Sequence, residues 1–414
     1  MDQSHRRPRA SAPRHAPARA LTGRPRAGTV TDVSAHADRG IVVDGGRDPS
    51  GAPCSPAAVA GRIVDGEPSG EPARFDADGL LVAPGFIDLQ VNGAAGIDLT
   101  SEPERIWEVA TALPRFGVTS FLPTLVSSPR EVVERALDVL AVGPPAGWVG
   151  ARPLGLHLEG PMIAPRRRGA HAAQHVVTPS SAVIAGWSAD AGVAMVTLAP
   201  ELSGAMGVIA ELAGRGVVVS AGHTDADERV ARDAVAAGVR AVTHLFNAMA
   251  PLGPRDPGLV GATLAGLPVI AGLIADGAHL APDVLTLAWR ALGPDRRMLV
   301  SDATAALGAP PGRYRLGTRG IASDGARAWD PTTGRPAGSA AGLDAAVSNV
   351  VAITGCDVSA AITAATSTPA RLLGRAELGA LDVGSPADMI LLDPELRVVA
   401  TIVRGVVVHR RDPG

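Results

Sequence analysis

The chain has 414 residues, 46% hydrophobic and 19% charged, a balance typical of a folded globular protein rather than a disordered one. All 38 basic residues are Arg and the formal net charge is −3, so a nucleic acid is not expected as the main partner. No uninterrupted run of about 18 apolar residues occurs, so no membrane span is expected. The two cysteines, Cys54 and Cys356, form no CxxC pattern or disulfide framework, which favours a cytoplasmic location.

Residues 1–27 contain seven Arg together with several Pro and Ala. They lack the apolar centre of a signal peptide, so we expect a disordered extension, with a targeting segment as the alternative.

Both ends of the remaining chain carry short Val/Ile-rich pieces broken by Gly, Pro and Asp, a pattern typical of short strands and turns. We therefore expect a small β-sandwich domain built from residues 28–82 together with residues 384–414. The pieces lie at 40–43, 62–64, 79–82, 388–392 and 400–408.

Residues 83–383 alternate between short apolar runs and helical stretches. Eight strands alternating with helices predict a parallel sheet, and the count favours a closed (β/α)8 TIM-like barrel, which needs about 250 residues. A doubly wound open sheet is the alternative. The eight runs are 84–91, 118–124, 154–159, 193–199, 217–222, 239–244, 269–275 and 298–302.

The helices between these runs have recognisable starts and apolar faces. Ser101 to Glu104 and Ser128 to Glu131 each form a Ser-x-x-Glu pattern, which predicts a capping box before an apolar stripe. Gly117 is expected to end the first of these helices. Further helices are expected at 224–237 and 282–292.

Polar side chains stand at or just beyond the ends of several runs, where the active site of such a barrel lies. Glu159, His223 and His244 follow three of these runs and would form a three-ligand metal site with a position open for water. A bound metal lowers the pKa of its water towards about 7. Asp302 ends the eighth run and is the candidate general acid and base. A single buried His is more often structural, but two His, one Glu and one Asp together at strand ends favour a metal site.

Several segments, taken in order from about residue 80 to residue 385, resemble the amidohydrolase superfamily and, within it, the N-acetylglucosamine-6-phosphate deacetylases. Individually these motifs are weak, but together they are specific. They are Val82-Ala-Pro-Gly-Phe-Ile-Asp-Leu-Gln90-Val-Asn92-Gly93, Gly155-Leu-His-Leu-Glu159-Gly-Pro with Gly169-Ala-His171, Ser220-Ala-Gly-His223-Thr, Thr243-His244-Leu-Phe-Asn247-Ala248-Met, Ile274-Ala-Asp-Gly-Ala-His279 and Val300-Ser-Asp302-Ala-Thr.

The resemblance implies a role for each matching residue. It assigns Glu159, His223 and His244 to the metal and Asp302 to proton transfer, while His171 would polarise the acetyl carbonyl or orient a sugar hydroxyl. A guanidinium fork suits a phosphate group. The residues assigned to the sugar phosphate are Asn247, the backbone N–H of Ala248, Arg255 and His279.

Two segments depart from the family pattern. Many amidohydrolases have His-x-His where this chain has Gln90 and Asn92, and an amide is a poor zinc ligand. A second metal is therefore doubtful, and the two amides are expected to hydrogen-bond in the pocket. In the loop before Asp344, residues 341–343 (Ala-Gly-Leu) replace the Leu, Thr and Met usual in the family, which could change how the sugar ring is enclosed.

The resemblance thus predicts hydrolysis of the acetamide of N-acetylglucosamine 6-phosphate with one divalent metal per chain. Zn²⁺ is the first choice of metal, with Fe²⁺, Mn²⁺ or Co²⁺ as alternatives, and a homodimer is expected. The alternatives are the N-acetylgalactosamine 6-phosphate reaction, another N-acyl amidohydrolase reaction, and a catalytically inactive barrel that serves as a scaffold.

Overall fold

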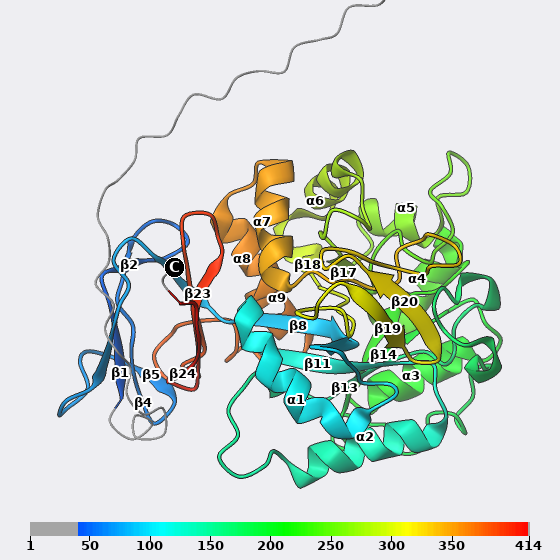
Figure 1. Ribbon diagram of the computed structural model, residues 1–414. Helices are drawn as coiled ribbons and strands as arrows, with labels where there is room; N and C mark the ends of the chain where they lie inside the picture. Colours follow the sequence, from blue (N-terminus) through cyan, green and yellow to red (C-terminus); the bar gives the residue numbers. More distant parts are fainter. Residues whose placement is uncertain (1–39, 413–414) are drawn as a thin grey trace, which may run out of the picture.

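A computed structural model describes residues 40–412 of the chain. The interpretation of residues 1–27 as a disordered extension therefore lies outside the described residues. Figure 1 shows a ring of helices around a central barrel, with the sheets from the two chain ends side by side on one flank.

The barrel consists of eight parallel strands in sequence order, and each strand of the series pairs with the next. It closes through contacts between the first strand and the segment after the last, where Val91 and Ala303 form a parallel bridge. The (β/α)8 prediction is confirmed, and the open-sheet alternative is wrong. The strands are β8 (Phe86–Val91), β11 (Val118–Val126), β13 (Leu156–Glu159), β14 (Val193–Leu198), β15 (Val218–Ala221), β16 (Val239–Val242), β17 (Ile270–Leu273) and β18 (Arg297–Leu299).

Helices follow most strands and pack against their neighbours around the barrel. Only two short 3-10 turns, Pro165–Arg167 and Ala173–His175, follow β13. The helices are α1 (Ile106–Ala112), α2 (Arg130–Val142), α3 (Ala205–Gly214), α4 (Glu228–Ala237), α5 (Gly258–Leu264), α6 (Pro282–Arg296), α7 (Leu343–Thr354), α8 (Val358–Ala365) and α9 (Ser367–Leu372).

The two predicted capping boxes are not formed. Ser101 Oγ donates to Asp98 Oδ2 at 2.6 Å and to the carbonyl of Gly317 at 3.1 Å, so it does not cap the helical segment that follows. Helix α2 begins at Arg130 with no side-chain cap. Gly117 does end the first helical segment in a left-handed conformation, with φ of 77°. Ser101 hydrogen-bonds to residues outside the helical segment, one of them Gly317, which is distant in sequence, and a local motif cannot reveal such a partner.

Side chains on the two faces of the barrel strands belong to separate clusters. Along β15, Val219 and Ala221 pack with residues of the helices, whereas Val218 packs in a second cluster with other strands and α9. Because side chains alternate along a strand, Ser220 shares the inward face with Val218. The inner face is therefore apolar towards one end of the barrel and polar towards the other.

The two chain ends build two further sheets around a shared core. Residues such as Val43 and Phe75 from the N-terminal end pack with Met389 and Ile402 from the C-terminal end. On β22, Ile390 faces the barrel cluster instead, so this sheet is covered on both faces. The domain bounds 28–82 with 384–414 and 83–383 stay a prediction. One sheet contains β1 (Ile41–Asp44), β4 (Ala57–Val59), β5 (Arg62–Val64) and β6 (Ala73–Asp76); the other contains β2 (Gly46–Arg47), β3 (Pro53–Cys54), β7 (Leu81–Pro84), β22 (Met389–Leu392), β23 (Val398–Val403) and β24 (Val406–Arg410).

One element was not predicted. After β18 the chain forms a small antiparallel sheet of β19 (Gly312–Leu316), β20 (Arg319–Ser323) and β21 (Ala328–Trp329) before it reaches α7. Within residues 40–412, no helix has the length and apolar character needed to cross a membrane.

Candidate active site

The site lies at the carboxyl ends of the barrel strands, where the backbone is unusually constrained. Five of the nine non-glycine residues with positive φ in the described part of the chain are here, and His223, His244 and Asp302 have φ of 50°, 31° and 52°. This left-handed conformation costs a non-glycine residue about 1 kcal/mol or more and concentrates at functional sites. The turns aim these side chains into a cavity of about 400 Å³.

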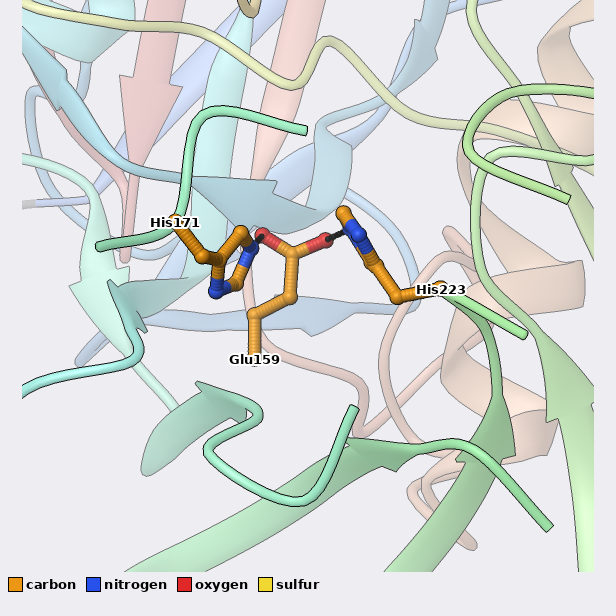
Figure 2. A group of neighbouring side chains, drawn as sticks. All are labelled: Glu159, His171 and His223. Atoms are coloured by element: carbon orange, nitrogen blue, oxygen red, sulfur yellow. Dashed lines mark hydrogen bonds and ion pairs between the residues drawn. The ribbon is translucent and has the colours of Figure 1, made fainter. Parts of the chain in front are cut away.

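Glu159, the last residue of β13, is the centre of a cluster of imidazoles. Its Oε1 atom lies 3.1 Å from His223 Nε2 and 3.0 Å from His244 Nε2, and these two nitrogens are 3.1 Å apart. Figure 2 shows the carboxylate between the rings of His171 and His223. Burial opposes the charge of Glu159, but the imidazoles outweigh this effect and hold its pKa well below the usual range. The carboxylate is therefore ionised at neutral pH.

The hydrogen bond on the far side of His223 shows which nitrogen can act as a ligand. His223 Nδ1 lies 2.7 Å from the carbonyl oxygen of Arg167, which can only accept, so Nδ1 carries the proton. In the neutral ring the lone pair of Nε2 then faces the carboxylate oxygen of Glu159 and the ring nitrogen of His244. Such converging lone pairs fit a divalent cation with one oxygen and two nitrogen ligands.

His171 has the opposite arrangement. Its Nδ1 accepts the backbone N–H of Ser127 at 3.1 Å, so in the neutral ring Nε2 carries the proton. Burial, followed by the neighbouring imidazole of His223, lowers the pKa of His171 to about 4 and favours the neutral ring. His171 Nε2 lies 3.6 Å from Glu159 Oε2. Ligand atoms of Glu159, His171 and His223 come within 4.8 Å of one another, but this proton makes His171 a donor rather than a ligand.

Asp302 follows β18 and lines the same cavity. Its Oδ1 accepts a hydrogen bond from Asn92 Nδ2 at 2.8 Å. Burial and then the nearby charge of Glu159 raise the pKa of Asp302 to about 7. A carboxyl group poised near neutrality can both take up and release a proton, as a general acid and base must. A bound cation would lower this pKa.

The amides of the first strand make hydrogen bonds at the site. Gln90 Nε2 donates to Glu159 Oε1 at 3.0 Å, and Asn92 donates to Asp302 as described above. Both side chains are buried. Each amide N–H group donates a hydrogen bond to a carboxylate, so both residues act as hydrogen-bond donors and not as metal ligands.

Only some of the residues assigned to the phosphate lie at the cavity. Asn247, Ala248 and His279 line the cavity that also contains the imidazole cluster. Arg255 lies on an exposed stretch of the loop before α5 and is not part of this cavity wall. Within the described chain, Arg255 therefore does not reach the site.

Sequence reasoning did not identify Asp276, which lies three residues before His279. Asp276 Oδ2 lies 2.8 Å from His279 Nδ1, and the Asp-x-x-His spacing was the only local signal. It also missed the mouth of the cavity, to which β20 and the loop after β21 contribute Arg319 and Asp330, 3.0 Å apart. Of the residues that replace the family pattern before Asp344, Leu343 is fully buried at the start of α7.

An eight-stranded barrel with two imidazoles and a carboxylate converging at its strand ends defines the class of metal-dependent barrel hydrolases. The sequence profile of the amidohydrolase family matches residues 81–408. The chain belongs to the amidohydrolase family. Enzymes of this family depend on a metal, and the carboxylate of Glu159 with the imidazoles around it could bind one.

Individual relatives share most of their length with the chain. Human N-acetylglucosamine-6-phosphate deacetylase is 42% identical over 353 residues, which cover 82% of this chain and 86% of that protein. The N-acetylgalactosamine-6-phosphate deacetylase of Shewanella sp. (strain ANA-3) is 34% identical over 338 residues, covering 81% and 84%. A mutant N-acetyl-D-glucosamine-6-phosphate deacetylase from Mycobacterium smegmatis, solved in complex with N-acetyl-D-glucosamine-6-phosphate, superposes with a TM-score of 0.80 at 33% identity, covering 90% and 99%.

Proposed function

We propose that the protein hydrolyses the acetamide of N-acetylglucosamine 6-phosphate to glucosamine 6-phosphate and acetate. The observation that supports this most is a single cavity with Glu159, His223 and His244 on its wall, Asp302 beside them, and His279, whose pKa Asp276 raises against the effect of burial, also lining it. This arrangement combines a site for amide hydrolysis with a receptor for an anion. Relatives that share most of the chain are named for this reaction.

One divalent ion, with Zn²⁺ first and Fe²⁺, Mn²⁺ or Co²⁺ as alternatives, is proposed to bind Glu159 Oε1, His223 Nε2 and His244 Nε2. When bound, it would polarise the acetyl carbonyl and lower the pKa of water. Gln90 donates to Glu159, and the Arg167 carbonyl orients His223, so both ligands are held from outside the cluster. No second metal is proposed at Gln90 and Asn92.

The proton transfers are assigned to Asp302 and the polarisation of the substrate to His171. Asp302 takes a proton from the attacking water and gives one to the leaving nitrogen, while Asn92 holds its carboxylate in place. The N–H of His171 Nε2, presented by the bond between Ser127 and Nδ1, donates to the acetyl oxygen as charge develops there.

The phosphate is assigned to the part of the cavity lined by Asn247, Ala248 and His279. Arg255 is exposed and outside the cavity of its own chain. This location fits the proposed homodimer, in which the phosphate site would lie near the subunit interface. A cytoplasmic location is proposed because Cys54 and Cys356 are both free thiols.

N-acetylgalactosamine 6-phosphate is the second candidate substrate, because a relative 34% identical over 81% of the chain is named for that sugar. The two sugars differ only in the configuration of one hydroxyl group. Another N-acyl substrate is less favoured because Asp276 raises the pKa of His279 against the effect of burial, and His279 lines the cavity. A catalytically inactive scaffold would have no need of both the imidazole cluster and Asp302.

The test is a measurement of metal content and deacetylation rate on one preparation. The substrates are N-acetylglucosamine 6-phosphate, N-acetylgalactosamine 6-phosphate and unphosphorylated N-acetylglucosamine. We expect about one metal per chain, as three ligands predict, and activity only on phosphorylated sugars. Metal without deacetylation of any of these sugars would reject the proposed substrate class, and a chain without metal would reject the ligand set.

A further inference from the structure

Asp276 is buried in the loop after β17 and makes four hydrogen bonds. Its Oδ1 accepts the backbone N–H groups of Ala278 and His279, each at 2.9 Å. Its Oδ2 lies 2.8 Å from His279 Nδ1 and accepts Ser339 Oγ at 3.0 Å. The carboxylate is therefore held on both oxygens, and its position relative to the His279 ring is determined.

These bonds dictate where the protons of His279 must be. Burial opposes ionisation of Asp276, but its bonds with His279 outweigh this and lower the pKa of Asp276 to about 2. An ionised carboxylate only accepts, so His279 Nδ1 carries a proton. In a neutral ring, Nε2 would then present a lone pair, which repels a phosphate oxygen. His279 can donate to an anion in the cavity only as an imidazolium.

We propose that Asp276 is a positioning residue that holds His279 as an oriented imidazolium and so gives the cavity its preference for a phosphorylated substrate. The identity of that anion as the substrate phosphate rests on the proposed function. The preference for an anion in this part of the cavity does not, because it follows from the Asp276–His279 geometry alone. No hydrogen-bond partner of His279 Nε2 occurs among residues 40–412, which leaves this nitrogen available to a ligand.

Arg166, Arg167 and Arg335 also line the cavity, with Arg167 Nε 2.6 Å from Asp225 Oδ1, and their positive charges attract the same anion. Burial opposes the charge of His279, but Asp276 outweighs it, and Asp302 on the segment after β18 adds to the effect, so the pKa of His279 is raised. Arg319 and Asp330, at the mouth, are paired with each other at 3.0 Å. The remaining carboxylate of the cavity, Glu159, is occupied by the metal-site imidazoles.

Asp276 also connects the two functional parts of the cavity. Ser339 donates its hydroxyl group to Asp276 Oδ2 and its backbone N–H to the carbonyl oxygen of Asp302 at 2.8 Å. The loop that carries the anion receptor and the loop that carries the acid and base are thus joined through one fully buried serine. Ser339 therefore fixes the position of Asp276, and with it that of His279, relative to Asp302.

The experiment compares Asp276→Asn with the wild type and with Asp48→Asn in the metal-loaded protein. Asp48 is a matched control because it also accepts two backbone N–H groups and a serine hydroxyl, but it lies in the loop between β2 and β3 and contacts no imidazole. At pH 8 we expect Asp276→Asn to raise the KM for the phosphorylated sugar about 10- to 100-fold, the loss typical of a bond to a charged group, with a smaller change in kcat. Asp48→Asn should leave both unchanged.

The pH dependence separates this role from a merely structural one. Without Asp276, the burial that opposes the charge of His279 is no longer offset, so the pKa of His279 should fall to or below its ordinary value of about 6.5, and the ratio of variant to wild-type KM should be small at pH 5 and grow towards pH 8. Titration of the phosphate is common to both proteins and cancels in the ratio. An equal ratio at both pH values, or a fall in kcat with an unchanged KM, would overturn the proposal.

A measurement without turnover keeps the inference separate from the proposed reaction. The His279 ring signal, identified by its loss in His279→Gln, is titrated by NMR, and glucose 6-phosphate binding is measured by calorimetry. We expect Asp276→Asn to lower the pKa of His279 and to weaken glucose 6-phosphate binding. This result would hold even if no sugar were deacetylated, whereas unchanged titration and binding would reject the inference even in an active enzyme.

If Asp276→Asn does not fold, Ser339→Ala takes its place. This variant should raise KM by less than about tenfold, because it removes one hydrogen bond to Asp276 and keeps the carboxylate charge. No rise in KM would count against the proposal.

Discussion

Two regions of the cavity each bring an imidazole within about 3 Å of a carboxylate, but they suit ligands of opposite charge. In the Glu159 region, His223 donates through Nδ1 to a backbone carbonyl and presents the lone pair of Nε2 to the carboxylate. In the Asp276 region, the carboxylate accepts the hydrogen bond from Nδ1, and Nε2 has no hydrogen-bond partner among residues 40–412. The first arrangement suits a cation between the partners, and the second suits an anion that accepts a proton held on Nε2.

The difference shows that the far side of the ring decides what a His–carboxylate pair binds. Both regions pair an imidazole with a carboxylate, and in both the two side chains are at most 6% exposed. A carbonyl oxygen carries no net charge and fixes only the position of the Nδ1 proton, whereas an ionised carboxylate on Nδ1 stabilises the doubly protonated ring. His171 is a third case, because a backbone N–H on Nδ1 turns Nε2 into a neutral donor.

The largest effect should come from breaking the cation region. Glu159→Gln removes the charge that three imidazoles surround, so metal content should fall from about one per chain to well below half, with activity lost in proportion. Elemental analysis and rate measurement on the same sample test this. The control is Glu134→Gln, which removes a surface carboxylate 2.7 Å from Arg130. Full metal content in Glu159→Gln would contradict the assignment.

Asp302 lies between the two regions, and its loss should be the next largest effect. Asp302→Asn should reduce kcat about 10²- to 10⁴-fold while metal content stays near one per chain. In the wild type, the pKa of about 7 that burial gives Asp302 is lowered by a bound cation, so the rate should fall on the acid side below pH 7, where the base becomes protonated. The control is Asp227→Asn at the start of α4, where Asn caps a helix equally well. Near-native turnover of Asp302→Asn with metal bound would remove Asp302 from the mechanism.

The smallest effect concerns the stability conferred by the anion region. The pKa of His279 is raised in the folded protein, so its contribution is fully present below its ordinary pKa of about 6.5 and is lost as pH rises through the raised value. His279→Gln should therefore lower Tm more at pH 5.5 than at pH 9, by about 2 °C at most. Thermal unfolding of both proteins at these pH values measures the difference. A Tm difference independent of pH would mean that the Asp276–His279 pair is not charged.

Most of the barrel could be predicted because each strand is a short apolar run of its own. The run expected at 193–199 is β14 (Val193–Leu198), and the run at 239–244 contains β16 (Val239–Val242). The three-stranded sheet around Tyr314 was not predicted, because its exposed strands carry charged residues and no apolar run. The prediction of a capping box at Ser101 was wrong because the fold brings Asp98 and Gly317 within hydrogen-bonding distance of its hydroxyl group.

The candidate site was predicted in its residue types and not in its geometry. Gln90 and Asn92 were expected to hydrogen-bond in the pocket, and they do so with Glu159 and Asp302. The assignments of ligands and of phosphate contacts remain predictions. Arg255 illustrates the limit, since its loop is polar in sequence but exposed in the fold, outside the cavity of its own chain.

The sequence by itself determined the barrel, because hydrophobic periodicity and helix stops are local properties of the chain. It also determined which donors stand at the strand ends, because a parallel barrel brings those ends together. Only the tertiary structure decided which nitrogen of each imidazole faces the cavity. That choice depends on a carbonyl of Arg167, an N–H of Ser127 and the carboxylate of Asp276, groups brought to the rings by loops whose conformation no periodic pattern describes.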